Sequence, residues 1–141
     1  MNRTEYKYSD LTGRIIKAAM FVHTALGNGF QEVIYQRALQ IELRDSNLSF
    51  EREQEMPIYY KNTPIGKRRV DFFVEDKIAL EIKAVTELQD VHVSQAINYL
   101  EAYDLEIGLL INFGARSLQF KRVYNKSFKQ KLQGNPLQRK S

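Results

Sequence analysis

The sequence predicts an α/β fold in which helices pack against one sheet, with elements in the order α-α-β-β-β-α-β-β. Three observations predict it. Apolar residues recur at helical spacing over 15–26 and 33–43. The middle of the chain, 56–84, has apolar runs separated by turn residues, which is typical of strands. The segment 107–113 is a continuous apolar run, as expected of a central strand that is covered on both faces.

The expected helices have recognisable ends. We expect Asp10 or Thr12 to cap the first helix, and the Gly-Asn-Gly sequence at 27–29 to end it. A second helix is expected over about 31–44. The third is expected over 88–103, where apolar residues stand three to five positions apart.

The strand signal varies in quality along the chain. Alternation is poor over 48–53 and clearer over 56–60, where Pro57 favours an edge strand or a strand start. The segment 61–64 is expected to be a hairpin turn. Further strands are expected over 65–74, 78–84, 107–113 and 118–124.

Composition limits the class of protein. A chain of 141 residues suits one domain, which we place at 1–125 with a basic C-terminal tail at 126–141. No apolar run approaches the roughly 18 residues of a membrane span, so we expect no membrane association and a cytoplasmic location. The absence of cysteine excludes disulfides and thiolate metal sites, and two histidines cannot build a histidine-rich zinc site. A metal would therefore need oxygen ligands.

The net charge of +4 is unevenly distributed. Residues 1–120 carry 14 basic and 17 acidic side chains, whereas 121–141 carry seven basic and no acidic ones. Such an end can attract phosphate backbones. A solvated, partly frayed tail is an equal alternative.

Charged residues interrupt two of the expected strands. Asp71 lies between Val70 and Phe72, and Glu81 and Lys83 share one face of the next strand because side chains alternate. An Asp and a Glu on neighbouring strands offer oxygen ligands to a hard cation such as Mg²⁺. A lysine beside the metal suits hydrolysis of a phosphodiester. A cross-strand salt bridge is the alternative explanation.

The third helix carries a polar stripe. His92, Gln95 and Tyr99 are spaced by three and four, so they share one face. This face could point to the carboxylates, with Gln95 bonded to a metal-bound water or a phosphate. The simpler alternative is that Gln95 and Tyr99 satisfy backbone groups and that His92 lies on the surface.

A further motif opens the second helix. Gly29 suits a tight turn, and Glu32 and Tyr35 share a face three residues apart. Glu32 could reach the strand carboxylates and complete the oxygen shell of a metal. Its position in the first helical turn is also favoured by the helix dipole alone.

Several short motifs in order resemble one family. Gly29-x-x-Glu32-x-x-Tyr35 resembles the signature of the GxxExxY proteins, a branch of the PD-(D/E)XK nuclease-like superfamily. The likeness continues through Ala38-Leu39, Glu42-Leu43, Pro57-Ile58-x-Tyr60-Lys61, Arg69-x-Asp71, Glu81-Ile82-Lys83-Ala84-Val85, Gln95-x-x-x-Tyr99-Leu100 and the segment 108–114.

The resemblance implies a restriction-endonuclease-like core, with a mixed central sheet flanked by helices. It implies that Asp71 and Glu81 bind Mg²⁺ or Mn²⁺, that Lys83 is catalytic, and that Glu32 joins the metal site. Gln95 and Tyr99 match the Gln-x-x-x-Tyr element on the following helix. Val70 stands where the superfamily's name has proline, a position that the superfamily does not require to be proline.

Basic residues near these positions suggest a nucleic-acid contact. Lys67, Arg68 and Arg69 precede Asp71, and alternation places Arg69 on its face and Arg68 away from it. Lys121 and Arg122 are further candidates in the last strand. Charges that protect an edge strand are the alternative for the first group.

We therefore expect a Mg²⁺-dependent nuclease that acts on DNA. The alternative is a non-catalytic nucleic-acid-binding or accessory subunit that retains the fold. A homodimer is one option for the assembly, because a small domain that faces a duplex often works as a dimer.

Overall fold

Helices and strands follow one another in the predicted order over residues 7–128, the part of the chain that the computed structural model describes. They are α1 (Ser9–Leu26), α2 (Glu32–Asp45), β1 (Phe50–Tyr60), β2 (Thr63–Val74), β3 (Ile78–Lys83), α3 (Asp90–Ala102), β4 (Ile107–Asn112) and β5 (Gln119–Tyr124). The predicted α/β fold class is confirmed.

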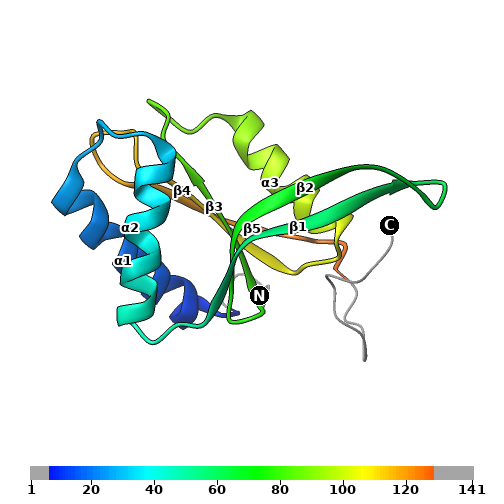
Figure 1. The fold of residues 1–141 in the computed structure, drawn as a ribbon, viewed down its shortest axis with the longest axis horizontal. Helices are drawn as coiled ribbons and strands as arrows, with labels where there is room; N and C mark the ends of the chain where they lie inside the picture. Colours follow the sequence, from blue (N-terminus) through cyan, green and yellow to red (C-terminus); the bar gives the residue numbers. More distant parts are fainter. Residues whose placement is uncertain (1–6, 129–141) are drawn as a thin grey trace.

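One mixed sheet organises these elements, with strand order β1-β2-β3-β4-β5. The pair β3–β4 is parallel, and the other neighbouring pairs are antiparallel. The parallel pair needs a crossover, which α3 provides. Helices α1 and α2 cover one face of the sheet and α3 covers the other (Figure 1).

Apolar residues fill the space on both faces. On one side, α1 and α2 contribute Ile15 and Leu39 to a cluster with Phe72, Leu80 and Ile82 of the sheet. On the other side, α3 packs against a smaller cluster that includes Met56, Val70 and Val123. Every residue of β4 is buried, which confirms the prediction of a central strand covered on both faces.

The hairpin of β1 and β2 extends well beyond the rest of the sheet (Figure 1). Lys61 and Asn62 form its turn with φ values of 50° and 65°, the left-handed conformation of two-residue hairpin loops. β1 pairs with β2 from Phe50 to Tyr60, so the poorly alternating segment belongs to the strand, and the hairpin turn is present but shorter than the expected 61–64. This pairing stabilises a segment whose own alternation is poor. Pro57 is tolerated because β1 is an edge strand.

The helix starts also differ from expectation. Helix α1 begins at Ser9 after Tyr8, and Asp10 and Thr12 lie inside it. Thr12 Oγ1 donates back to the carbonyls of Tyr8 and Ser9, each at 3.2 Å, so it does not act as a cap. Helix α3 begins at Asp90, two residues later than expected.

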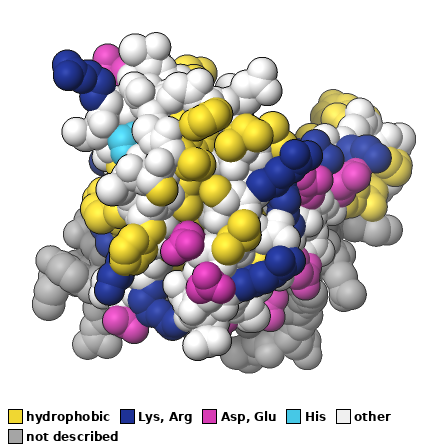
Figure 2. All heavy atoms as spheres, turned by 60° about the vertical axis from the view of Figure 1, so that its left-hand side comes forward, with side chains coloured by type: hydrophobic (Ala, Val, Ile, Leu, Met, Phe, Trp, Pro, Cys, Tyr) yellow, Lys and Arg dark blue, Asp and Glu magenta, His cyan; other side chains and the backbone are white. Residues whose placement is uncertain are grey.

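Part of α1 presents an apolar surface. Met20 and Phe21 are about half exposed and, with Lys17, Thr24 and Ala25, they line an open groove of about 520 Å³. Figure 2 shows hydrophobic side chains gathered on the face that carries α1 and α2.

Within residues 7–128, no helix is long and apolar enough to cross a bilayer. The expected basic tail lies outside the described residues from 129 onward and stays a prediction.

Candidate functional site

Asp71 lies where β2 separates from β3. The β2–β3 ladder pairs Val74 with Ile78 at one end and Phe72 with Leu80 at the other, so it stops one residue short of Asp71. Beyond it, Asp71 Oδ2 accepts a hydrogen bond of 2.7 Å from the backbone N–H of Ile82. The carboxylate therefore takes the place of a strand carbonyl and is fixed against β3.

The faces of β2 exchange at the same point. Val70 packs in the cluster beneath α3, whereas Phe72, two residues on, packs beneath α1 and α2. In a regular strand these two side chains would share a face. On β1, Glu53 lies between the partners of Val70 and Phe72 and has φ 56°. This irregularity leaves Asp71 between the two halves of the core.

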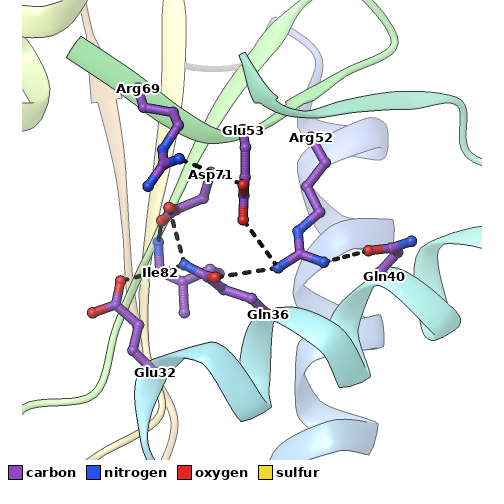
Figure 3. Close-up of polar contacts among 8 residues, drawn as sticks. All are labelled: Glu32, Gln36, Gln40, Arg52, Glu53, Arg69, Asp71 and Ile82. Carbon is purple, nitrogen blue, oxygen red and sulfur yellow. Dashed lines mark hydrogen bonds and ion pairs between the residues drawn. The ribbon is translucent and has the colours of Figure 1, made fainter. Parts of the chain in front are cut away.

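Helix α2 brings a second carboxylate to Asp71. Gln36 Nε2 donates to Asp71 Oδ1 at 3.0 Å and to Glu32 Oε1 at 3.5 Å (Figure 3). Glu32 stands at the start of α2, where the loop after α1 turns toward the sheet. One amide therefore links the helical glutamate to the strand aspartate.

The third carboxylate belongs to Glu81 and has a counterion. Arg68 Nη2 lies 3.4 Å from Glu81 Oε1 and 3.1 Å from the backbone oxygen of Gln95. The guanidinium also lies 4.8 Å from the ring centre of Tyr99. Arg68 faces α3 whereas Asp71 faces Gln36 of α2, so the two side chains point to opposite sides of β2, as alternation predicted.

Burial and neighbouring charges shift the pKa values of Asp71 and Glu32. Burial raises the pKa of Asp71 to about 6; the charges of Glu32 and Glu81 add to this, and the Ile82 hydrogen bond and Lys83 oppose it. Burial also raises the pKa of Glu32, Lys83 opposes that shift, and Glu81 adds to it. Three carboxylates and one ammonium therefore share a partly buried region, with an excess of negative charge.

The donor set fits a hard divalent cation. Carboxylate oxygens are the ligands that Mg²⁺ and Mn²⁺ prefer, and added positive charge would favour the charged forms of Glu32 and Asp71, which burial and, to a smaller extent, repulsion by neighbouring carboxylates disfavour. Each oxygen of Asp71 accepts one hydrogen bond and retains a lone pair. The side chains are not gathered into a cage as they stand: over residues 7–128, no three His, Cys, Asp or Glu side chains form a group that could hold a metal.

A comparison with protein-family models matches residues 9–123 to the PD-(D/E)XK nuclease superfamily. The chain belongs to this superfamily. A solved structure described as "Crystal structure of SSO0001" is similar in fold, with a TM-score of 0.53 and 20% identity over 84% of this chain. The chain spans 60% of the length of that structure. No curated protein matches the chain.

The family match covers all the elements of the PD-(D/E)XK domain described above, almost to the end of β5. It confirms the predicted superfamily and fold, and the likeness to the solved structure agrees with that fold. It also gives the cluster of Asp71, Glu81 and Lys83 a setting in which divalent-metal chemistry is typical.

The loop after β3 is fixed by a buried asparagine of β4. Asn112 pairs with Lys83 in the parallel ladder, and its side chain exchanges hydrogen bonds of 2.9 Å with both backbone groups of Val85. Gly114 approaches Val85 so closely that a Cβ would lie 2.3 Å from its carbonyl oxygen. The end of β3, which carries Lys83, is therefore held by contacts that a larger residue at 114 would break.

Tyr35 has a structural place in the PD-(D/E)XK domain. Its hydroxyl donates to the carbonyl of Gly27 at 2.6 Å and accepts from the N–H of Phe30 at 3.1 Å. Its ring stacks on Phe113 with centres 4.7 Å apart. Tyr35 thus fastens the loop that leads into Glu32.

The polar residues of α3 that could have pointed to the carboxylates, His92, Gln95 and Tyr99, have other positions and partners. Tyr99 is buried and its hydroxyl donates to the sulfur of Met56 at 3.0 Å. Gln95 has an exposed side chain. His92 Nδ1 accepts from the N–H of Gln89 and so caps the helix. Among these residues, Tyr99 and Gln95 reach the carboxylates only through Arg68.

The basic candidates lie in two groups at opposite edges of the sheet. Lys67 pairs with Glu55 at 2.8 Å and Arg69 with Glu53 at 3.6 Å on the hairpin. A hollow of about 230 Å³ on this hairpin is lined by Glu55, Lys67, Arg68 and Arg69. On β5, Lys121 is exposed, and Arg122 donates to Thr12 at 2.9 Å. Figure 2 shows basic side chains beside acidic ones, in line with these ion pairs.

Two residues that contact this site, Gln36 and Arg52, were not predicted from the sequence. Arg52 Nη2 donates to Gln36 Oε1 at 3.3 Å, so both residues connect to Asp71 (Figure 3). The spacing of four between Glu32 and Gln36 was an available signal, since such residues are neighbours on a helix. Nothing in the poorly alternating segment around Arg52 indicated its partner.

Proposed function

We propose that this domain is a Mg²⁺- or Mn²⁺-dependent nuclease that hydrolyses phosphodiester bonds in DNA, and that it belongs to the GxxExxY branch of the superfamily. The observation that supports the proposal is that Gln36 links Glu32 to Asp71 in a PD-(D/E)XK fold, close enough to Glu81 and Lys83 for their charges to act on both carboxylates. The branch assignment is supported by Gly29, Glu32 and Tyr35, because the first helix turn and its fastened loop present Glu32 to Asp71.

Each charged residue has a role in the proposal. Asp71 and Glu81 hold the metal, and Glu32 adds a third carboxylate. The bound metal supplies Lewis acidity and lowers the pKa of a coordinated water. Lys83 contributes its own positive charge, which orients the attacking water and stabilises the charge that develops on the phosphate.

In this proposal Arg68 binds Glu81 in the free protein and a phosphate of the bound nucleic acid. Its guanidinium neutralises Glu81 in the free protein, at 3.4 Å. A phosphate oxygen would compete with Glu81 for the same donors, because guanidinium groups bind carboxylate and phosphate with similar geometry. Gln95 and Tyr99 support the site by holding Arg68 through a carbonyl and a ring face.

The hairpin supports nucleic acid as the partner. Between Met56 and Val70 the chain carries four basic residues and no acidic one. Lys67 and Arg69 are mostly exposed, and their pairs with glutamates of β1 involve exposed groups. Exposed ion pairs contribute little to stability, so these cations can turn to phosphates at small cost. Lys121 and Arg122 form a second basic group on β5 for the same partner.

A non-catalytic nucleic-acid-binding or accessory subunit is the second candidate. It is favoured by two observations: Glu81 is paired with Arg68, and no group among residues 7–128 is already assembled for a metal. Under this alternative, Arg68 would stay on Glu81 permanently.

A cleavage assay separates the two. Purified protein is incubated with supercoiled, linear duplex and single-stranded DNA, and with RNA, in Mg²⁺, Mn²⁺ or chelator. The nuclease proposal expects metal-dependent cleavage of DNA that Asp71→Ala and Lys83→Ala abolish while both variants keep the circular dichroism of the unchanged chain. Binding of DNA without cleavage under every condition would support the accessory subunit.

A further inference from the structure

The side-chain amide of Gln36 lies between carboxylates and a guanidinium (Figure 3). Its nitrogen donates to Asp71 and Glu32, and its oxygen accepts from Arg52. A carboxylate can only accept hydrogen bonds and a guanidinium can only donate them. These two sides therefore admit one orientation of the amide, with its NH₂ group toward the carboxylates.

We propose that Gln36 and Arg52 are positioning residues that hold Glu32 and Asp71 together for the metal. This proposal rests on the nuclease function proposed above. Two carboxylates that accept hydrogen bonds from the same amide nitrogen carry like charges and repel each other. An amide NH₂ that donates one hydrogen to each carboxylate opposes that repulsion without taking the place of a metal ion.

Arg52 is built to fix the amide. Its Nη1 donates to Gln40 Oε1 at 2.6 Å, and its Nη2 lies 3.4 Å from Glu53. Its guanidinium lies 5.7 Å from the ring centre of Phe72. These contacts hold a planar fork at one place, and a lysine ammonium offers neither the plane nor the two separated donors. Arg52 therefore determines which end of the Gln36 amide faces the site.

The first test measures metal affinity. Mn²⁺ is titrated calorimetrically into the unchanged full chain, Gln36→Met and Arg52→Lys. Arg44→Lys is the matched control, because Arg44 lies on α2 over the ring of Phe50 and contacts no carboxylate of the site. Residues that orient metal ligands typically change affinity by 10- to 100-fold, so we expect a loss of about tenfold or more in the two test variants and none in the control. Thermal unfolding in chelator checks that all variants are folded.

The second test needs no metal. Arg52 and Asp71 are joined through Gln36, so Arg52→Lys and Asp71→Asn should have non-additive effects on unfolding in urea with chelator. We expect a coupling of about threefold or more in the unfolding equilibrium constant. The coupling should vanish when both changes are made in a Gln36→Met chain.

The outcomes separate this inference from the proposed function. Loss of Mn²⁺ affinity together with coupling through Gln36 supports the inference. Unchanged Mn²⁺ affinity in both variants, or additive effects in the presence of Gln36, overturns it and leaves the nuclease proposal standing. Absence of Mn²⁺ binding by the unchanged chain overturns the proposed metal site and, with it, the role given to Gln36 and Arg52.

Discussion

The carboxylate of Asp71 accepts the backbone N–H of Ile82 at 2.7 Å, one residue beyond the last β2–β3 pair. This contact fixes the aspartate of one strand against the neighbour that carries Glu81 and Lys83. It also keeps a partly buried carboxylate hydrogen-bonded at the place where the hairpin leaves the sheet. The site therefore depends on the end of a ladder, where side chains have room that regular pairing would remove.

Asp71 should make stability depend on pH. Its pKa rises from 3.8 to about 6 on folding, so the folded chain holds this proton more tightly than the unfolded chain. The free energy of unfolding contributed by Asp71 is therefore highest below about pH 4 and falls as the pH rises to about 6. The difference corresponds to about 3 kcal/mol.

Urea unfolding in chelator from about pH 4 to about pH 7.5 tests this dependence. The unchanged chain should lose stability relative to Asp71→Asn over that interval, because asparagine does not titrate. A stability difference between the two chains that stays constant with pH contradicts the prediction.

Lys83→Ala should separate catalysis from binding. The ammonium is proposed to act on charge that develops during cleavage, and loss of one such group typically costs about 100-fold or more in rate. Mn²⁺ affinity should not fall, because the variant removes a positive charge near the ligands. Single-turnover cleavage of DNA and Mn²⁺ calorimetry measure the two effects. Equal rates for Lys83→Ala and the unchanged chain would remove Lys83 from the mechanism.

Arg68→Ala should have opposite effects on two ligands. Removing the counterion of Glu81 is expected to raise Mn²⁺ affinity by about fivefold, since a partly exposed ion pair contributes up to about 1 kcal/mol. DNA affinity in chelator should decrease, because a phosphate contact is lost. Calorimetry and fluorescence anisotropy report the two affinities. A simultaneous decrease in both would indicate that Arg68 has a structural role at this position.

The hairpin cations should set part of the salt dependence of DNA binding. Each phosphate contact contributes about one to the slope of log affinity against log salt, so Lys67→Ser with Arg69→Ser should lower the slope by about two. Lys17→Ser with Arg44→Ser is the control, since it removes two exposed cations from α1 and α2. Equal slopes for the two double variants would show that the hairpin is not a specific interface.

Tyr35→Phe should affect stability before activity. The change leaves the ring on Phe113 and removes the hydroxyl that joins Gly27 to Phe30. Loss of a buried hydroxyl that satisfies two backbone groups should cost about 1–3 kcal/mol in chemical unfolding. Tyr60→Phe is the control, because Tyr60 lies exposed beside the hairpin turn. A cost no greater than that of the control contradicts this account of Tyr35.

Local patterns predicted most of the fold because they are set by neighbours in sequence. The helical spacing of α1 and α2 reflects the one face of each helix that is buried, and the apolar run of β4 reflects a strand that is buried on both faces. The extent of β1 could not be predicted, because its poorly alternating half is held by pairing with β2. The first cap was missed for a similar reason: Thr12 bonds backward within the helix and to Arg122 of β5.

The candidate site was predictable as a set of charges but not as a geometry. The period of two placed Glu81 and Lys83 on one face, and spacing of three associated Glu32 with Tyr35. Alternation could not show that Arg68 reaches Glu81, because that ion pair joins side chains of two strands, β2 and β3. Gln36 and Arg52 meet only in the folded chain, where they lie 16 residues apart in sequence.

The most direct test is a crystal structure of the protein grown with millimolar Mn²⁺, with anomalous difference density measured at the manganese edge. The account predicts a manganese peak bonded to Asp71 and Glu81, with Glu81 turned away from Arg68 and Gln36 still donating to Asp71. Absence of such a peak, with Glu81 still paired to Arg68, would contradict the proposed metal site.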